Sequence, residues 1–379
     1  MTRRSSGPAA APVEDRRAGF LRSLDTPAAV IDLAIVERNI ARLQRACDRA
    51  GVRNRPHVKT HKSVHLARLQ RAAGAVGITC QKLGEAEVMA EAGLDDILIS
   101  YNVVGEPKRA RLRALAARCT LTLSCDSGVA AEGYARALAG RDGPTVGVLV
   151  ECDTGRRRSG VPDPHAAAAL ARLVAALPGL HFAGLLLYPP DGDLAASAAF
   201  VAAAKAACTA QGLPLQVISS GGTPNRGRIG RLGETEYRAG TAIYNDRQMV
   251  RAGAAQPGDC ALEIAATVVS APSSTARSRI RAPGRVLIDA GSKILSSDLG
   301  GFDDFGELPD HPQARLYRLA EEHGFVDVSA CANPPRVGDV VRVRPNHACV
   351  VANLVDRVWC TRDGEPAGTL LVDARGRVS

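Results

Sequence analysis

The chain has 379 residues, of which 46% are hydrophobic and 23% charged, and its 48 Lys and Arg against 39 Asp and Glu give a net charge of +9. This composition excludes a mostly disordered chain, a collagen-like repeat and a disulfide-stapled miniprotein. Aromatic residues make up only 3%, which leaves little for base stacking, so the positive charge favours anionic small molecules over nucleic acid.

Cysteine usage and the first residues bear on the compartment. The ten cysteines are scattered and form no C-x-x-C pair, which is typical of a reducing cytoplasm rather than of a disulfide framework. Residues 1–23 carry early arginines but no apolar stretch after them, so they predict a flexible tail and not a signal peptide. No run of about 18 apolar residues occurs, so no membrane-spanning helix and no membrane partner is expected.

Strand and helix patterns alternate along the first two thirds of the chain, beginning with a strand at 26–33 and a helix at 34–50. Further strands are predicted at 77–80, 96–100, 121–125, 146–151, 182–188 and 215–219, with helices at 83–92, 107–118, 129–139, 164–176 and 195–211. Such alternation is typical of parallel βα units. It predicts an α/β fold with an N-terminal (β/α)8 TIM-like barrel over residues 24–252. An open doubly wound sheet is the alternative, weakened because no G-x-G-x-x-G follows a strand.

After about residue 255 the helical periodicity nearly vanishes. Short strands separated by Gly and Pro are predicted at 268–269, 285–289, 340–343, 357–360 and 369–372. They indicate a smaller C-terminal antiparallel β domain over residues 253–379, which we expect the first N-terminal strand to join.

Two clusters in the predicted barrel could carry chemistry. Lys59 lies in a dense polar run, R-P-H-V-K-T-H-K-S at residues 55–63, and a lysine among cations at a barrel mouth can have the lowered pKa that imine formation needs. A solvated basic loop is the alternative. The run S-S-G-G-T-P at residues 219–224 follows a strand, and paired glycines with hydroxyls suit a phosphate cradle or an ordinary Gly-rich turn.

Two further clusters are weaker signals. Residues 150–160 read V-E-C-D-T-G-R-R-R-S-G, an acid at a strand end followed by arginines, which suits an anionic cofactor ring or a surface turn with ion pairs. His347 and Cys349 are two residues apart in an expected strand, so both side chains should point to one face. An imidazole and a thiolate in this arrangement could hold one zinc-like cation; a buried Cys beside a polar His is the alternative.

Taken in order, the motifs R-P-H-V-K-T-H-K, G-I-T-C-Q-K-L-G-E-A-E, E-C-D-T-G-R-x-R-S-G, S-G-G-T-P, T-E-Y-R-A-G-T, L-I-D-A-G-S-K and P-N-H-A-C resemble one known family. They are similar to the metal-activated pyridoxal-phosphate enzymes that include D-threonine aldolase and eukaryotic-type D-serine dehydratase. The resemblance covers roughly residues 24–375. It implies an alanine racemase-like fold, a homodimer and a small D-amino acid substrate.

The resemblance also implies roles for matching positions. Lys59 would bind pyridoxal 5'-phosphate as an imine. The cofactor-binding positions would be His57, Lys59, Gln81, Arg158, Tyr188, Ser220, Gly221, Gly222, Thr223 and Tyr244. His347 and Cys349 would bind a divalent metal, zinc or manganese, that grips the substrate's β-hydroxyl, and with Lys59 they would be the catalytic residues.

The implied activity is a lyase reaction on β-hydroxy-D-amino acids, and retro-aldol cleavage to glycine and an aldehyde is our main prediction. Dehydration of D-serine or 3-hydroxy-D-aspartate to a keto acid and ammonia, racemisation, and a non-enzymatic pyridoxal-phosphate-binding protein are the alternatives. The β domain argues against the last of these. Where the family tends to place a His and a Gly, this chain has Tyr188-Pro189-Pro190, and Asp191, His61 or His323 could replace the missing His.

Overall fold

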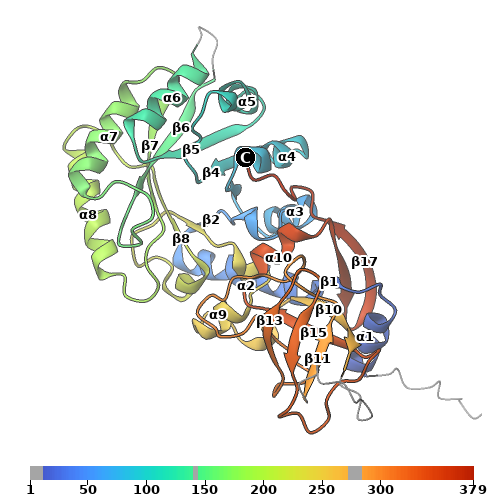
Figure 1. Ribbon diagram of the computed structural model, residues 1–379. Helices are drawn as coiled ribbons and strands as arrows, with labels where there is room; N and C mark the ends of the chain where they lie inside the picture. Colours follow the sequence, from blue (N-terminus) through green and yellow to red (C-terminus); the bar gives the residue numbers. More distant parts are fainter. Residues whose placement is uncertain (1–11, 140–143, 272–283) are drawn as a thin grey trace, which may run out of the picture. The chain divides into compact units, whose positions relative to one another are not determined.

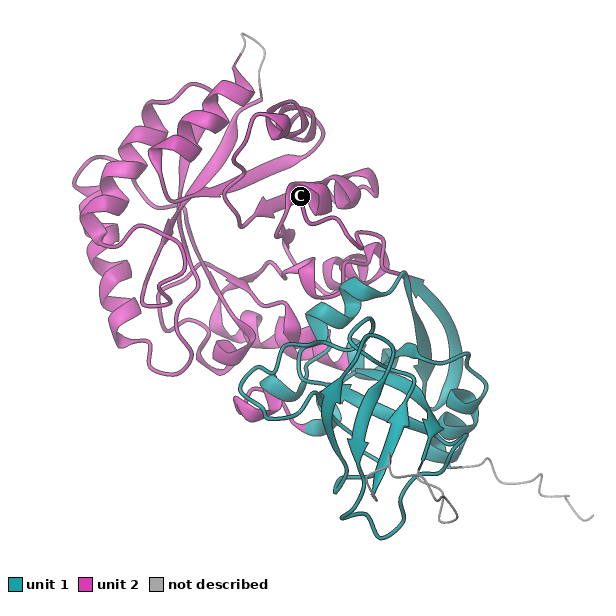
Figure 2. Ribbon diagram, viewed as in Figure 1, with its two compact units in different colours: residues 1–36, 244–248, 257–370 teal, residues 37–243, 249–256, 371–379 magenta. Residues whose placement is uncertain are grey.

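The computed structural model describes residues 12–139, 144–271 and 284–379. The chain forms two compact units (Figure 2). Unit 1 comprises residues 1–36, 244–248 and 257–370, and unit 2 comprises residues 37–243, 249–256 and 371–379. Each unit is therefore assembled from separated stretches of chain rather than by a single cut near residue 252.

Unit 2 is a parallel barrel with helices around it (Figure 1). Its strands are β2 (Arg53–Asn54), β3 (Ile78–Cys80), β4 (Asp96–Ile99), β5 (Thr120–Cys125), β6 (Val146–Cys152), β7 (Leu180–Leu187), β8 (Val217–Gly221) and β9 (Glu236–Arg238). They pair in the order β2-β9-β8-β7-β6-β5-β4-β3. The two ends of this order meet, because the Val76 N–H donates to Asn54 O and the Thr79 N–H donates to Pro56 O. The predicted TIM-like barrel is thus confirmed.

Helices and short turns connect these strands. They are α2 (Leu33–Ala50), η1 (Val58–Thr60), α3 (Val64–Ala72), α4 (Leu83–Glu91), α5 (Pro107–Ala116), α6 (Gly128–Leu138), α7 (Pro164–Ala176), α8 (Ala195–Thr209), η2 (Thr223–Arg228), η3 (Thr241–Ile243) and α9 (Arg247–Arg251). Helix α7 shows how local sequence starts a helix. The Asp163 side chain accepts from the His165 and Ala166 N–H groups, and Pro164 follows as the first helical residue. Strand β6 is buried along its whole length, as a parallel strand covered on both faces should be.

Unit 1 is a mostly antiparallel β structure. Its strands are β1 (Ala28–Asp32), β10 (Leu262–Ser270), β11 (Arg285–Ile288), β12 (Gly306–Glu307), β13 (Arg315–Leu319), β14 (Gly324–Asp327), β15 (Val340–Pro345), β16 (Arg357–Arg362) and β17 (Glu365–Leu371). The first strand, β1, pairs antiparallel with β10 and parallel with β16. The unit also contains α1 (Val13–Arg22), η4 (Pro257–Asp259) and α10 (Ala348–Leu354).

Helix α1 corrects the expectation of a flexible tail for the part of it that is described. Leu21 is buried in a cluster with Val30 and Ala265, and Arg17 Nη2 lies 2.8 Å from Glu263 Oε2. These contacts order a segment whose sequence shows no strong helical periodicity. The rest of the predicted tail, residues 1–11, lies outside the described residues.

The state of the cysteines and the character of the helices bear on two of the sequence-based expectations. All ten cysteines carry free thiols. Among the residues that the structure describes, no helix is both long and apolar enough to cross a membrane.

Candidate active site

Four polar or small residues of unit 2 directly follow barrel strands: Gln81 after β3, Ser100 after β4, Tyr188 after β7 and Gly222 after β8. The carboxyl ends of parallel barrel strands share one face, where barrel active sites are built. Lys59 joins them from η1, with its Nζ 3.1 Å from Gln81 Oε1.

His57 precedes this lysine, and its hydrogen bonds define its tautomer. Its Nδ1 accepts from the Lys59 N–H at 3.4 Å, so the ring proton is on Nε2, which lies 3.1 Å from Gln81 Oε1 and 3.2 Å from Ser100 Oγ. Burial lowers the pKa of His57 well below its ordinary value, and the nearby Lys59 and Arg238 charges lower it further. His57 is therefore neutral, and it holds Gln81 rather than titrating.

The glycines of the S-S-G-G-T-P run lie in a turn beside Tyr188. Gly222 has φ = 123°, and a Cβ there would lie 2.9 Å from Tyr188 Cε2. A Cβ on Gly221 would lie 1.9 Å from Arg238 O, so neither position tolerates a side chain. Thr223 Oγ1 accepts from the Ala242 N–H at 3.0 Å, and Ser220 is buried next to this turn.

The arginine-rich loop after β6 covers Tyr188. The Arg156 guanidinium lies 4.3 Å from the ring centroid and that of Arg158 lies 5.2 Å from it. Arg156 Nε also donates to Pro189 O at 3.0 Å and pairs with Asp191. The Pro189–Pro190 departure is thus anchored by Arg156, and Asp191 is engaged in an ion pair.

The other suggested replacements for the missing histidine differ in setting. His61 is completely buried; its Nδ1 accepts from the Ser63 N–H, and its Nε2 lies 3.2 Å from Gln70 Oε1. Burial lowers the pKa of His61 to about 4. His323 is exposed and belongs to unit 1. His61 is thus held by Ser63 and Gln70, and His323 belongs to a different unit from Lys59 and Gln81.

A buried polar chain through the barrel was missed by the sequence analysis. Arg238 Nε donates to Ser219 Oγ at 2.8 Å, which donates to Glu236 Oε1 at 2.8 Å, and Arg55 Nε donates to Glu236 Oε2 at 2.7 Å. Burial lowers the pKa of Arg238. The signal was available, because Glu236 and Arg238 are two residues apart on one short strand and therefore share its inner face.

The predicted metal pair lies in unit 1, in a different local structure from the one expected. Strand β15 ends at Pro345, His347 is the N-cap of α10, and Cys349 is in its first turn. The expectation of a strand was wrong because Asp246 Oδ2 accepts from the Ala348 N–H at 3.0 Å and starts a helix there. The two side chains nevertheless meet in a hydrogen bond.

His347 has a second polar neighbour. Its Nδ1 lies 3.0 Å from Asp298 Oδ2, and the hydrogen bond with Cys349 raises the pKa of His347 to about 9, although burial lowers it. No group of three or more His, Cys, Asp or Glu side chains in the described residues could hold a metal ion. The protein thus offers two neighbouring donors, not a closed ligand set.

Tyr244 is the one predicted cofactor position outside unit 2. It is 1% exposed in unit 1, and burial raises its pKa, with smaller effects from Cys360 and Cys349. Tyr244 is therefore close enough to Cys349 of the predicted metal pair to interact with it electrostatically.

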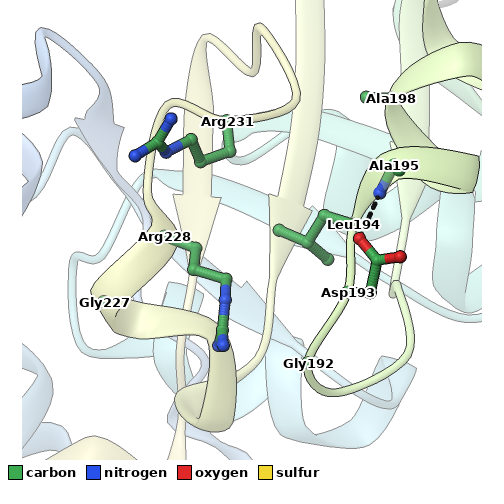
Figure 3. A pocket seen from close by; sticks show the side chains of 8 residues that line it. All are labelled: Gly192, Asp193, Leu194, Ala195, Ala198, Gly227, Arg228 and Arg231. Atoms are coloured by element: carbon green, nitrogen blue, oxygen red, sulfur yellow. Dashed lines mark hydrogen bonds between the residues drawn. The ribbon is translucent and has the colours of Figure 1, made fainter.

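A cavity of about 590 Å³ in unit 2 contains none of the predicted residues. Its lining is Gly192, Asp193, Leu194, Ala195, Ala198, Gly227, Arg228 and Arg231. In Figure 3 the side chains of Arg228 and Arg231 extend in different directions, and Asp193 accepts from the Ala195 N–H. The arginines do not converge on one anion, so this cavity is not the candidate active site.

A barrel with a lysine among strand ends, combined with a separate β unit, defines the alanine racemase-like class. Residues 31–248 match the family described as "Alanine racemase, N-terminal domain", and residues 261–361 match the one described as "Putative serine dehydratase domain". The chain belongs to this family of alanine racemase-like lyases.

Individual relatives agree with this assignment. The chain is 34% identical to a D-threonine aldolase from Arthrobacter sp. over 94% of both chains. It is 36% identical to D-threo-3-hydroxyaspartate dehydratase from Delftia sp. over 87% of this chain and 92% of the relative.

Solved structures show the same relationships. D-threonine aldolase from Filomicrobium marinum superposes with a TM-score of 0.86 at 31% identity, over 95% of this chain and 98% of that one. The Delftia dehydratase superposes with a TM-score of 0.80 at 33% identity, over 93% and 98%. A D-threo-3-hydroxyaspartate dehydratase has also been solved with a histidine replaced by alanine and with a cysteine two positions later replaced by alanine, the latter in a metal-free form.

Proposed function

We propose that this chain is a pyridoxal-phosphate- and divalent-metal-dependent lyase that cleaves β-hydroxy-D-amino acids by the D-threonine aldolase reaction. The observation that carries the proposal is the Lys59 amino group, held 3.1 Å from Gln81 Oε1 at the carboxyl face of the barrel. A half-buried lysine with an ordered acceptor is suited to be a nucleophile. The 34% identity to a D-threonine aldolase supports the reaction type.

The residues present fit pyridoxal phosphate. Gly221 and Gly222 let the backbone of a buried turn with Thr223 run directly against Arg238 O and the Tyr188 ring, where a Cβ would not fit. The Gly222 N–H already donates to Arg238 O, so the role we propose for this glycine is to let the turn approach the Tyr188 ring closely, with the phosphate bound along the same turn. The cation-rich loop after β6 complements the cofactor's negative charge.

The chain's own residues would then divide the work as follows. Lys59 would attach the cofactor, and Gln81, fixed by His57, would hold the lysine nitrogen in place. Tyr188 and Arg158 would flank the ring, and Ser220 to Thr223 would hold the phosphate. Bound pyridoxal phosphate draws electrons from the substrate Cα, which supplies the driving force for bond cleavage.

The His347–Cys349 pair fits a divalent metal, zinc or manganese, with open positions for substrate or water. Because Asp298 contacts Nδ1, Nε2 is the nitrogen left to bind the ion, and an imidazole held by a carboxylate in this way is a typical metal ligand. A bound ion polarises a substrate hydroxyl or lowers its pKa. His347 would bind the metal in its neutral form, so the ion takes the place of a proton.

Dehydration of a β-hydroxy-D-amino acid is the second candidate function. The observation in its favour is the spacing of His347 and Cys349, which equals the spacing of the two positions replaced in the D-threo-3-hydroxyaspartate dehydratase mutant structures. A racemase has no need of the metal pair, and a simple cofactor-binding barrel has no need of unit 1.

A product assay tests the proposal. The purified chain, supplied with pyridoxal phosphate and manganese or zinc, is incubated separately with D-threonine, D-serine and D-threo-3-hydroxyaspartate. Glycine plus an aldehyde, lost on adding EDTA, is the expected result. Keto acid and ammonia would establish the dehydratase instead. No product from any substrate, with the lysine-bound cofactor visible in the spectrum, would contradict both.

A homodimer and a cytoplasmic location belong to the same proposal. Ten free thiols suit a reducing compartment. The D-amino acid substrate is inferred from the relatives, and sedimentation of the purified chain tests the dimer.

A further inference from the structure

Gln81, which holds Lys59, is itself held at its backbone by a completely buried carboxylate. Glu85 lies in the first turn of α4 and reaches back, so that its Oε2 accepts from the Gln81 N–H at 2.6 Å. Carboxylates that cap a helix usually lie at the surface, whereas Glu85 has no exposed area. Its burial needs an explanation beyond capping.

The counter-ion of Glu85 comes from the segment that carries Lys59, residues 55–63, which we call the lysine loop. Lys62 Nζ lies 3.3 Å from Glu85 Oε1, and both side chains are at most 8% exposed. Lys62 adopts φ = 53°, a left-handed backbone conformation that is unfavourable for a residue with a side chain. Its N–H donates to Val58 O and its carbonyl accepts from the Ala374 N–H. The backbone is thus bent at the position where it brings an ammonium group to Glu85.

These contacts form a closed circuit. It runs from Lys59 along the chain to Lys62, across to Glu85, on to the Gln81 backbone, and through the Gln81 side chain back to Lys59. Gln81 Nε2 also donates to Ser100 O at 3.3 Å, which prevents the carboxamide from flipping. Buried ion pairs contribute little net stability, since desolvation offsets their attraction, so stability alone does not account for the pair.

We propose that Glu85 and Lys62 are positioning residues that fix Gln81, and through it the Lys59 amino group, in the orientation in which it captures the cofactor. This inference rests on the proposed function, because it concerns the nucleophile of that reaction. Neither residue touches substrate or cofactor in this scheme. Both act through Gln81.

The test compares Glu85→Gln with Glu87→Gln, a matched change on the same helix at a partly exposed pair with Arg111. Cofactor-free full-length protein is mixed with pyridoxal phosphate, and the absorbance of the lysine-bound form is followed in time. We expect Glu85→Gln to slow uptake by about 10–100-fold, since small misplacements of a reacting group have effects of this order. Glu87→Gln should match the wild type. Equal uptake by both variants would overturn the proposal.

A second variant separates positioning from folding. Lys62→Met/Glu85→Gln removes both charges, so no unpaired buried ion remains and the melting temperature should recover relative to Glu85→Gln. Uptake should stay slow in this stable variant. Recovery of the wild-type rate would show that the circuit is dispensable.

Hydrogen exchange gives a readout that does not depend on the cofactor. Amides of residues 58–62 should exchange faster in both variants than in wild type and Glu87→Gln. If the wild type takes up no pyridoxal phosphate, the proposed function fails. The positioning role is tested separately, and it would be overturned if residues 58–62 exchange at the same rate in the wild type and in both variants.

Discussion

The lysine loop of unit 2 and the His347–Cys349 pair of unit 1 differ in how much of each site the protein itself supplies. Gln81 is fixed at its Oε1, its Nε2 and its backbone N–H before any ligand binds. His347 has Asp298 on one nitrogen and Cys349 as its other partner. Asp298 is about half exposed.

This difference suits the two chemistries. A covalent nucleophile has to be oriented by the protein, because proximity and orientation supply much of its reactivity. A metal ion orients its own ligands once bound, so two donors and one supporting carboxylate are enough to begin with. The comparison predicts that damage to the lysine loop removes cofactor capture, whereas damage to the metal pair leaves it intact.

Lys59→Ala should have the largest effect. Removing the nucleophile should abolish both lyase activity and the absorbance of lysine-bound cofactor, which spectrophotometry and the product assay measure together. Lys82→Ala is the matched control, since this neighbouring lysine instead lies 3.6 Å above the Tyr101 ring. Retained activity in Lys59→Ala would end the central proposal.

His347→Ala should separate the two regions. We expect activity to fall by about 100-fold or more, as it should when EDTA removes the metal, while cofactor absorbance stays at the wild-type level. His323→Ala, an exposed histidine of the same unit, should change neither. Joint loss of metal and cofactor would contradict the proposed independence of the two regions.

Asp298→Asn should have a smaller effect that sharpens the picture of the metal pair. Asn still accepts a hydrogen bond but lacks the charge that makes the imidazole more basic, so metal affinity should fall by about 10–100-fold. Titration calorimetry with zinc measures this directly. An unchanged affinity would mean that Asp298 does not support the ligand.

His61 should affect stability alone. Its pKa is about 4 in the folded chain and ordinarily about 6.5. In the unfolded chain His61 therefore binds a proton as the pH falls below about 6.5, whereas in the folded chain it binds one only below about pH 4. Protonation stabilises the unfolded chain in this interval, so the stability that is present above pH 6.5 is lost as the pH falls. Between pH 7 and pH 5 the loss is about 2 kcal/mol.

His61→Gln should remove that share of the acid sensitivity. The measurement is urea unfolding of wild type and variant at both pH values, with the difference between the two pH values compared. An identical pH dependence would show that the pKa of His61 is the same in the folded and the unfolded chain.

Local sequence signals pointed to several of the residues that the structure brings together. Lys59, Gln81 and Gly222 could be found because polar or small residues directly after apolar strands mark one face of a barrel, and the family resemblance gave them roles. The spacing of His347 and Cys349 predicted that their side chains are neighbours. It could not predict the local secondary structure, because a spacing of two residues can bring side chains together both in a strand and at the start of a helix. Asp246, about a hundred positions away, decided between them.

The buried ion pair could not be predicted in the same way. Nothing near Glu85 in the sequence distinguishes it from Glu87, which is partly exposed. The distinction depends on Lys62, whose left-handed backbone is set by contacts with distant chain. Likewise the buried polar chain through Arg55, Glu236 and Arg238 depends on which strands become neighbours. Strands β2 and β9, which pair with each other, are the first and the last barrel strands in the sequence.

The return of residues 371–379 to unit 2 has a consequence for biosynthesis. The Ala374 N–H donates to Lys62 O, and Asp373 Oδ2 accepts from the Val64 N–H at 2.7 Å. Strand β1 likewise pairs with β16, which is synthesised more than 300 residues later. The contacts of Lys62 and Val64 with residues 373–374 are therefore made late, because a ribosome must translate past residue 374 before they can form. A nascent chain can fold most of its barrel early, but the backbone contacts that hold the loop of the proposed cofactor-binding lysine form only after residue 374 has been synthesised.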